Sequence, residues 1–191
     1  GGRSVRLVPR VVRILRGGGW EIAVRLTTPG GDPAALAAQV ASDSIVAALG
    51  GDGYLGAVAR GCHESDAIFV PMPGGRGNDL CRALGIGTAP LARARDLARL
   101  GFASAPSGNE AVAGRVRHGA DLLAKRVRPL DGIWVRSRDG VRLALGVVSV
   151  GLDARANILA NESSLTSGPL AYGCGAFAAL ASPGPPEIIA T

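Results

Sequence analysis

The chain has 191 residues, and its 47% hydrophobic content is enough for one large domain, or for a domain and part of a second. Aromatic residues make up only 4%, which argues against a nucleic-acid module that stacks bases on aromatic side chains. The net charge of +6 depends on arginine, because Lys125 is the only lysine, and it favours acidic partners such as nucleotide phosphates or an anionic membrane surface.

Cysteine and histidine usage excludes several kinds of site. Cys62, Cys81 and Cys174 are odd in number and widely separated, which argues against a disulfide framework and suits a reducing compartment. His63 and His118 form no ligand spacing, so the sequence assigns no residue as a metal ligand. No apolar run reaches the roughly 20 residues that span a bilayer. The sequence therefore predicts a cytoplasmic protein, with peripheral attachment to a membrane left open.

The first half of the chain alternates predicted helices and strands. Helical spacing of apolar residues predicts a helix over 4–16, with Ser4 as N-cap, a possible kink at Pro9 and arginines on the other face. Partial alternation predicts a strand over 20–26, and Asp32 followed by Pro33 predicts a helix that continues to about residue 41. Further strands are predicted at 45–49 and 67–71, and further helices at 54–60, 79–84 and 90–100. This order predicts an α/β fold, a parallel sheet with helices on both faces and ligands at the carboxyl ends of its strands.

The second half has a different pattern. A loop rich in Pro, Ser and Gly is predicted at 102–108. Strands follow at 132–136 and 141–150, joined by a turn at Arg138-Asp139-Gly140, then a helix at 169–181 and a short apolar run at 188–189. We predict an α/β nucleotide-binding domain over 1–128 and an incomplete β-rich domain over 129–191. We also expect the chain to be truncated at its C-terminus and to lack an opening strand.

Two glycine-rich turns carry the chemistry. Gly50-Gly51-Asp52-Gly53 follows the strand at 45–49, and Gly74-Gly75-Arg76-Gly77-Asn78-Asp79 follows the strand at 67–71. Each turn precedes a helix, so backbone N–H groups and a helix N-terminus can approach a phosphate closely. Two such turns at the ends of neighbouring strands predict one crevice for a polyphosphate, and therefore a nucleotide-binding kinase.

The turns also resemble motifs of a known family. Gly50-Gly51-Asp52-Gly53-Tyr54-Leu55-Gly56 resembles the GGDGTxNE motif of the diacylglycerol kinase catalytic domain, and Pro73-Gly74-Gly75-Arg76-Gly77-Asn78-Asp79-Leu80 resembles its second motif. Leu130-Asp131-Gly132, Val150-Gly151-Leu152-Asp153-Ala154 and Leu170-Ala171-Tyr172 resemble later family segments in the same order. The resemblance therefore extends along nearly the whole chain.

This resemblance implies a fold and an activity. The fold is an α/β nucleotide domain like that of NAD kinase and diacylglycerol kinase, followed by part of a β-sandwich. The activity is transfer of the ATP γ-phosphate to a diacylglycerol-like or sphingoid lipid hydroxyl at the membrane surface, with Mg²⁺, and a homodimer is left open. Asp52 is implied as the catalytic residue. The implied nucleotide contacts are Thr27, Gly50, Gly51, Asp52, Gly53, Tyr54, Leu55, Gly56, Gly75, Arg76, Gly77, Asn78 and Asp79.

Several positions depart from the family motifs. Tyr54 and Arg76 replace threonines, and Gly56-Ala57 replaces Asn-Glu. These changes favour an alternative, a non-catalytic nucleotide- or lipid-binding relative, and a soluble-substrate kinase of the NAD-kinase type is a further alternative. Asp52 can also be read as part of an Asp-Gly turn, and Asn78 and Asp79 as a helix N-cap. The arginines of the first helix fit a solvated face, with contact to anionic lipid as the alternative.

Overall fold

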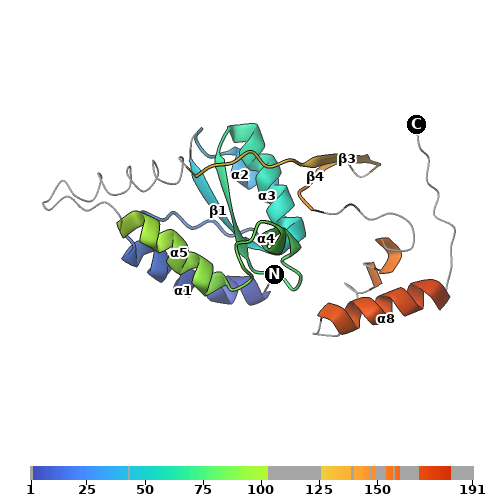
Figure 1. Cartoon of the computed structure of the whole chain (residues 1–191). Coiled ribbons are helices and arrows are strands. Elements are labelled where there is room, and N and C mark those ends of the chain that lie inside the picture. The colour runs from blue at the N-terminus through green and yellow to red at the C-terminus, as the bar shows by residue number, and fades with distance from the viewer. Residues whose placement is uncertain are drawn as a thin grey trace, which may run out of the picture. The chain divides into compact units, whose positions relative to one another are not determined.

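The computed structural model describes residues 2–42, 44–102, 126–138, 140–146, 148, 154–156, 158–159 and 168–181 (Figure 1). The chain divides into two compact units, Gly1–Gly146 and Val147–Thr191. In the first unit lie α1 (Gly2–Gly17), α2 (Pro33–Ala38), β1 (Ile45–Gly50), α3 (Asp52–Ser65), β2 (Ile68–Pro73), α4 (Asp79–Ala83), α5 (Pro90–Phe102), β3 (Ile133–Ser137) and β4 (Gly140–Ala144). The described part of the second unit contains α8 (Gly168–Ala181).

The central sheet confirms the predicted α/β class. Strands β1 and β2 pair in parallel, from Ile45 opposite Ile68 to Gly50 opposite Pro73. Both strands therefore end at the same edge of the sheet, and each continues directly into one of the glycine turns. Strands β3 and β4 form a separate antiparallel hairpin, from Ile133 opposite Ala144 to Ser137 opposite Gly140.

Helices cover both faces of the parallel pair (Figure 1). On one face, α2, α3 and α4 contribute to a buried cluster that includes Leu55, Val58 and Cys62. On the other face, α1 and α5 pack together, α1 against β1 and α5 against β2, and Val11 and Leu97 lie in a cluster with Met72. Successive side chains of a strand point to opposite faces of the sheet. The same two short strands therefore contribute residues to both clusters.

The hairpin β3–β4 packs against α3. A Cβ atom at position 56 would lie 2.7 Å from the Leu143 carbonyl oxygen, so only glycine permits this approach. The Arg60 guanidinium donates to the Val141 carbonyl oxygen at 2.8 Å, and the rings of His63 and Trp134 lie 5.8 Å apart. The hairpin therefore belongs to the first unit, while the predicted domain boundary after residue 128 stays a prediction.

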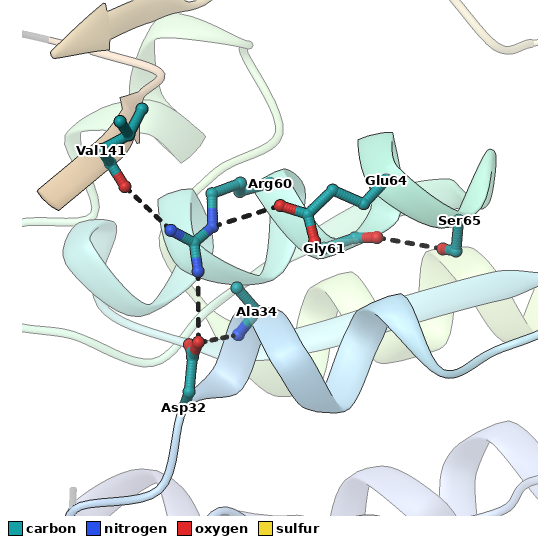
Figure 2. Close-up of polar contacts among 7 residues, drawn as sticks. All are labelled: Asp32, Ala34, Arg60, Gly61, Glu64, Ser65 and Val141. Atoms are coloured by element: carbon teal, nitrogen blue, oxygen red, sulfur yellow. Dashed lines mark hydrogen bonds and ion pairs between the residues drawn. The ribbon is translucent and has the colours of Figure 1, made fainter. Parts of the chain in front are cut away.

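The N-cap of α2 joins three elements, as Figure 2 shows. Asp32 Oδ1 accepts a hydrogen bond from the Ala34 N–H at 2.9 Å, which confirms Asp32 as the N-cap. Its other oxygen accepts from Arg60 at 3.1 Å. Arg60 Nε lies 3.6 Å from Glu64 Oε1, and another nitrogen of Arg60 donates to β4. One guanidinium therefore ties α2, α3 and the hairpin together.

The predicted strand over 20–26 is wrong, because this segment is irregular. Residues 20–23 and Arg25 line a cavity of about 590 Å³ together with Ile45–Ala48 of β1. A strand needs the backbone of a neighbouring strand at about 4.8 Å. Here the cavity lies between the segment and β1, where that hydrogen-bonded neighbour would have to be. Trp20 instead donates to the Leu97 carbonyl oxygen at 3.0 Å, and Arg16 donates to that of Ile22 at 3.1 Å.

Smaller differences concern the ends of elements. Helix α1 begins at Gly2, so Ser4 lies inside the helix instead of capping it, and the helix continues through Pro9. Helix α2 ends at Ala38, short of residue 41, while α3 is longer than predicted, and β4 ends at Ala144. The predicted loop at 102–108, the segment over 150–153 and the apolar run at 188–189 lie, apart from Phe102, outside the described residues.

Candidate functional site

The two glycine turns lie against each other, backbone to backbone. The Gly74 N–H donates to the Gly50 carbonyl oxygen at 2.8 Å, which extends the β1–β2 ladder into the turns. A Cβ atom at position 75 would lie 2.5 Å from Gly51 Cα, and one at position 74 would lie 2.9 Å from the Gly50 nitrogen. Glycine is therefore required at these positions by contact between the turns themselves.

Asp52 links the two turns through its side chain. It is the first residue of α3, and its Oδ1 accepts a hydrogen bond from the Leu80 N–H at 3.1 Å. Leu80 lies in the first turn of α4, so Asp52 satisfies one of the free N–H groups at that helix end. A helix of only five residues depends on such support from outside itself.

The carboxylates of Asp52 and Asp79 converge on Gly77. A Cβ atom at position 77 would lie 3.3 Å from Asp52 Oδ2 and 2.9 Å from Asp79 Oδ2. The other oxygen of each carboxylate is engaged, that of Asp52 by Leu80 and that of Asp79 by Arg82 at 2.7 Å. Each aspartate therefore has one oxygen left that faces the second turn.

Asn78 holds the second turn closed. It is buried and lies in the left-handed region with φ 56°. Its Oδ1 accepts from the N–H groups of Gly74 at 3.1 Å and Gly75 at 2.8 Å, and its Nδ2 donates to the Gly75 carbonyl oxygen at 3.1 Å. Asn78 occupies the N-cap position of α4, but its side chain turns back into the loop and Asp52 serves that helix end instead.

The residues after Asp52 divide between open and packed positions. Gly53 is exposed, and a Cβ atom there would meet nothing within 4 Å. The ring of Tyr54 lies against Gly50 and packs on the core, and Leu55 is fully buried. Gly56 faces Leu143 of β4, so the open part of this segment is at Gly53, in the first turn of α3.

Arg76 and Thr27 are the remaining predicted contacts. Arg76 is exposed at the tip of the second turn. Thr27 is half-buried in the irregular segment before α2, and in the part of the chain that the structure describes it makes no hydrogen bond to either turn. The structure thus brings together Gly50–Gly53 and Gly74–Asp79, while the place of Thr27 in the site stays a prediction.

Two residues near the turns were missed by sequence reasoning. Ser4 Oγ donates to the Gly74 carbonyl oxygen at 2.7 Å, which ties the start of α1 to the second turn. Cys81 lies just behind the turns, where burial raises the pKa of its thiol, the Asp52 charge raises it further, and Arg93 lowers it. Burial also lowers the pKa of Arg93. No motif spacing signals these contacts, since they join residues far apart in the chain.

The described residues contain no cluster of three or more His, Cys, Asp or Glu side chains that could hold a metal ion alone. They also contain no helix long and apolar enough to cross a membrane.

Two comparisons with known proteins gave matches. The diacylglycerol kinase catalytic domain profile matches residues 1–105. The chain is 37% identical over 89 residues to a probable lipid kinase YegS-like of Pseudomonas fluorescens, covering 44% of the chain and 30% of that protein. It is 40% identical over 96 residues to a protein of the same name from Pseudomonas putida, covering 48% of the chain and 32% of that protein. The matched segment spans about a third of each relative, and no solved structure matches the chain. The chain belongs to the diacylglycerol kinase catalytic domain family.

Proposed function

We propose that this chain holds the nucleotide-binding part of a lipid kinase, which transfers the γ-phosphate of ATP to a lipid hydroxyl at a membrane surface. The observation that carries the proposal is the pair of stacked glycine turns bridged by Asp52. Family membership and two relatives named as probable lipid kinases support a kinase activity. The printed names of those relatives leave the acceptor lipid open.

The ATP phosphates would lie at the N-terminus of α3. This helix has 14 residues and begins at Asp52, and the open space at Gly53 lets an anion approach its first N–H groups. In the second turn, the N–H groups of Gly74 and Gly75 already bond Asn78, so that turn contributes shape and the exposed Arg76 guanidinium. Arginine binds phosphate oxygens in a forked geometry.

The Asp79 carboxylate at Gly77 fits a magnesium ion shared with ATP. Mg²⁺ in phosphotransferases is held by one or two carboxylates together with substrate phosphates, and Asp79 is exposed with one oxygen free of the Arg82 pair. When bound, Mg²⁺ neutralises negative charge on the transferring phosphate. We assign Asp79 to this ion.

Asp52 would act as the general base. The free oxygen of Asp52 takes the proton of the lipid hydroxyl. At the same time the hydroxyl oxygen bonds to the γ-phosphorus, and the bond from that phosphorus to the departing ADP breaks. Its bonded oxygen keeps the carboxylate in place through Leu80. Asp52→Asn retains an oxygen for this hydrogen bond but cannot accept the proton, so we expect turnover to fall by about 10²–10⁴-fold with little loss of stability.

A radiolabelled-ATP assay on the full-length protein with a panel of lipid alcohols tests the function. We expect labelled lipid phosphate, a lowered kcat in Asp52→Asn, and a higher magnesium requirement in Asp79→Asn. ATP binding with no labelled lipid would overturn the lipid kinase proposal. Labelling of NAD or another soluble acceptor alone would instead favour the soluble-substrate class.

One observation favours the non-catalytic alternative. Tyr54, whose ring packs on the core, stands where the family motif has threonine, and Gly56, which has no side chain, stands where the motif has asparagine. Because Gly56→Asn would push against the Leu143 carbonyl oxygen, restoration is better tried with Tyr54→Thr and Ala57→Glu. Activity that appears only in the restored protein would support this alternative, and turnover by the wild-type protein would refute it.

A further inference from the structure

The positive charge of this chain is concentrated in two helices. The sequences of α1 and α5 contain eight arginines and a single acidic residue, Asp96. Their combined charge of +7 exceeds the +6 of the whole chain, so all other residues together are slightly acidic. The chain is therefore electrically asymmetric, and one pair of elements accounts for its net charge.

The fold places these helices side by side in one layer (Figure 1). Val11 and Leu15 of α1 pack with Ala94 and Leu97 of α5 in the buried cluster that covers one face of the sheet. The remaining face of each helix is turned to solvent. Six arginines of this layer are exposed: Arg6, Arg10, Arg13, Arg16, Arg95 and Arg99.

Most of this charge has no acidic partner within the described residues. Arg99 pairs with Asp96 at 3.2 Å, and Arg16 donates to a carbonyl oxygen. The guanidinium groups of Arg6, Arg10 and Arg13 recur at intervals of four and three residues, which places them in one stripe along α1. No carboxylate in the described part of the chain forms an ion pair with them.

The same helix begins at the candidate site. Ser4 Oγ donates to the Gly74 carbonyl oxygen at 2.7 Å, so the start of α1 is fixed to the second glycine turn. A helix of 16 residues is about 24 Å long. The basic stripe therefore runs from the edge of the phosphate-binding turns along one side of the domain. Val5, 51% exposed, adds an apolar side chain near the start of this helix.

We propose that the outer face of α1 and α5 is the surface by which this protein docks on an anionic lipid bilayer. Each arginine held near an anionic surface contributes attraction. The apolar faces of both helices are buried against the sheet, so this surface would bind lipid headgroups mainly through its arginines. The low aromatic content favours a bilayer over nucleic acid. Docking would give the proposed kinase access to a membrane lipid. Only this purpose of the docking rests on the proposed function.

Vesicle sedimentation with the 191-residue chain tests the surface without ATP. We expect binding to phosphatidylcholine vesicles that contain phosphatidylglycerol, little binding to pure phosphatidylcholine, and weakening by salt. The double variant Arg10→Gln/Arg13→Gln should bind about 25-fold more weakly, at about fivefold for each arginine. Both residues are exposed, and glutamine is a good helix former, so circular dichroism should be unchanged.

Arg136→Gln/Arg142→Gln is the matched control. It removes the same charge from exposed positions on the β3–β4 hairpin. We expect it to change the affinity for anionic vesicles by less than twofold. Equal weakening by the two double variants would overturn the proposal, because net charge would then explain binding. Absence of binding to the anionic vesicles would also overturn the proposal, whether or not the protein binds duplex DNA tightly.

The two proposals fail separately. Phosphorylation of detergent-dispersed lipid by a protein that does not bind anionic vesicles would overturn the docking surface alone. Binding to anionic vesicles through α1 and α5, with no lipid phosphorylated under any condition, would overturn the kinase function and leave the docking surface supported.

Discussion

At the scale of single residues, the buried Asn78 amide determines the shape of the second glycine turn. Asn78→Ala removes three hydrogen bonds. It also leaves alanine, which has no polar side chain to bond the nearby backbone, in the left-handed region. We expect a loss of about 2–4 kcal/mol in the free energy of unfolding, measured by urea denaturation. Among the described residues, the other non-glycine residue in the left-handed region, Asp66, is exposed, so Asp66→Ala measures the backbone cost alone and should lose about 1 kcal/mol. Equal losses in the two variants would show that the Asn78 bonds contribute nothing.

Gly61 and Gly53 lie in the same helix and should respond oppositely to alanine. A Cβ atom at position 61 would overlap the Ala34 carbonyl oxygen and lie 2.7 Å from the Ala37 side chain, whereas position 53 is open. Gly61→Ala should destabilise by about 1–3 kcal/mol because it separates α2 from α3. Gly53→Ala should stabilise by about 0.5–1 kcal/mol through helix propensity. Thermal melts of both variants measure this, and a shift of Tm in the same direction would contradict it.

Cys62 gives the protein an alkaline stability limit. Burial raises the pKa of its thiol to about 11 from 9.0. The folded chain therefore keeps a proton that the unfolded chain loses, so the free energy of unfolding falls as pH rises from about 9 to about 11. Urea titrations at pH 8 and pH 10 should show this fall, and Cys62→Ala should reduce it.

At pH 8 the exposed Cys174 should react with a thiol reagent well before the buried Cys62 and Cys81. Equal rates of reaction would contradict the burial of Cys62 and Cys81.

At the scale of elements, the Arg60 guanidinium stabilises α2 through its N-cap. Asp32→Ala should cost about 1–2 kcal/mol, because α2 loses its cap and Arg60 loses a partner. In a double-mutant cycle of Asp32→Ala with Arg60→Met, we expect a coupling of about 0.5–1 kcal/mol in the free energy of unfolding. Glu64→Gln is the control and should cost less, since Glu64 lies 3.6 Å from Arg60 and is half exposed. Full additivity in the cycle would show that the Asp32–Arg60 contact does not stabilise the fold.

Elements with strong local signals were predicted well. The Asp32-Pro33 start of α2 contains its own capping side chain and a preset first turn, so neighbours are not needed to find it. The segment 20–26 has an alternating pattern but no adjacent backbone to pair with, and a strand exists only as part of a ladder. The same limit explains why the end of the run predicted at 141–150 was placed too late, since β4 ends with its pairing to β3.

At the scale of the whole molecule, the hairpin β3–β4 should be needed for the stability of the first unit. A fragment over 1–146 keeps the contacts of Gly56 with Leu143 and of Arg60 with Val141, whereas a fragment over 1–128 loses them and exposes one side of α3. We expect the longer fragment to melt at least about 5 °C higher. A fragment over 1–128 that melts as high as 1–146 would support the domain boundary predicted from the sequence instead.

The sequence by itself determined the family, the α/β class and the two turns, because motifs, caps and glycine positions are properties of short stretches of chain. It also identified the residues at which the turns meet, from Gly50 to Asp79. Only the tertiary structure decided how they work together: Asp52 bonds Leu80, Asn78 closes its own turn, Ser4 joins α1 to Gly74, and Gly56 accommodates a hairpin. It alone placed the arginines of α1 and α5 in one layer. These relations join residues up to 87 positions apart, and packing of distant segments, which has no local sequence signal, sets their distances.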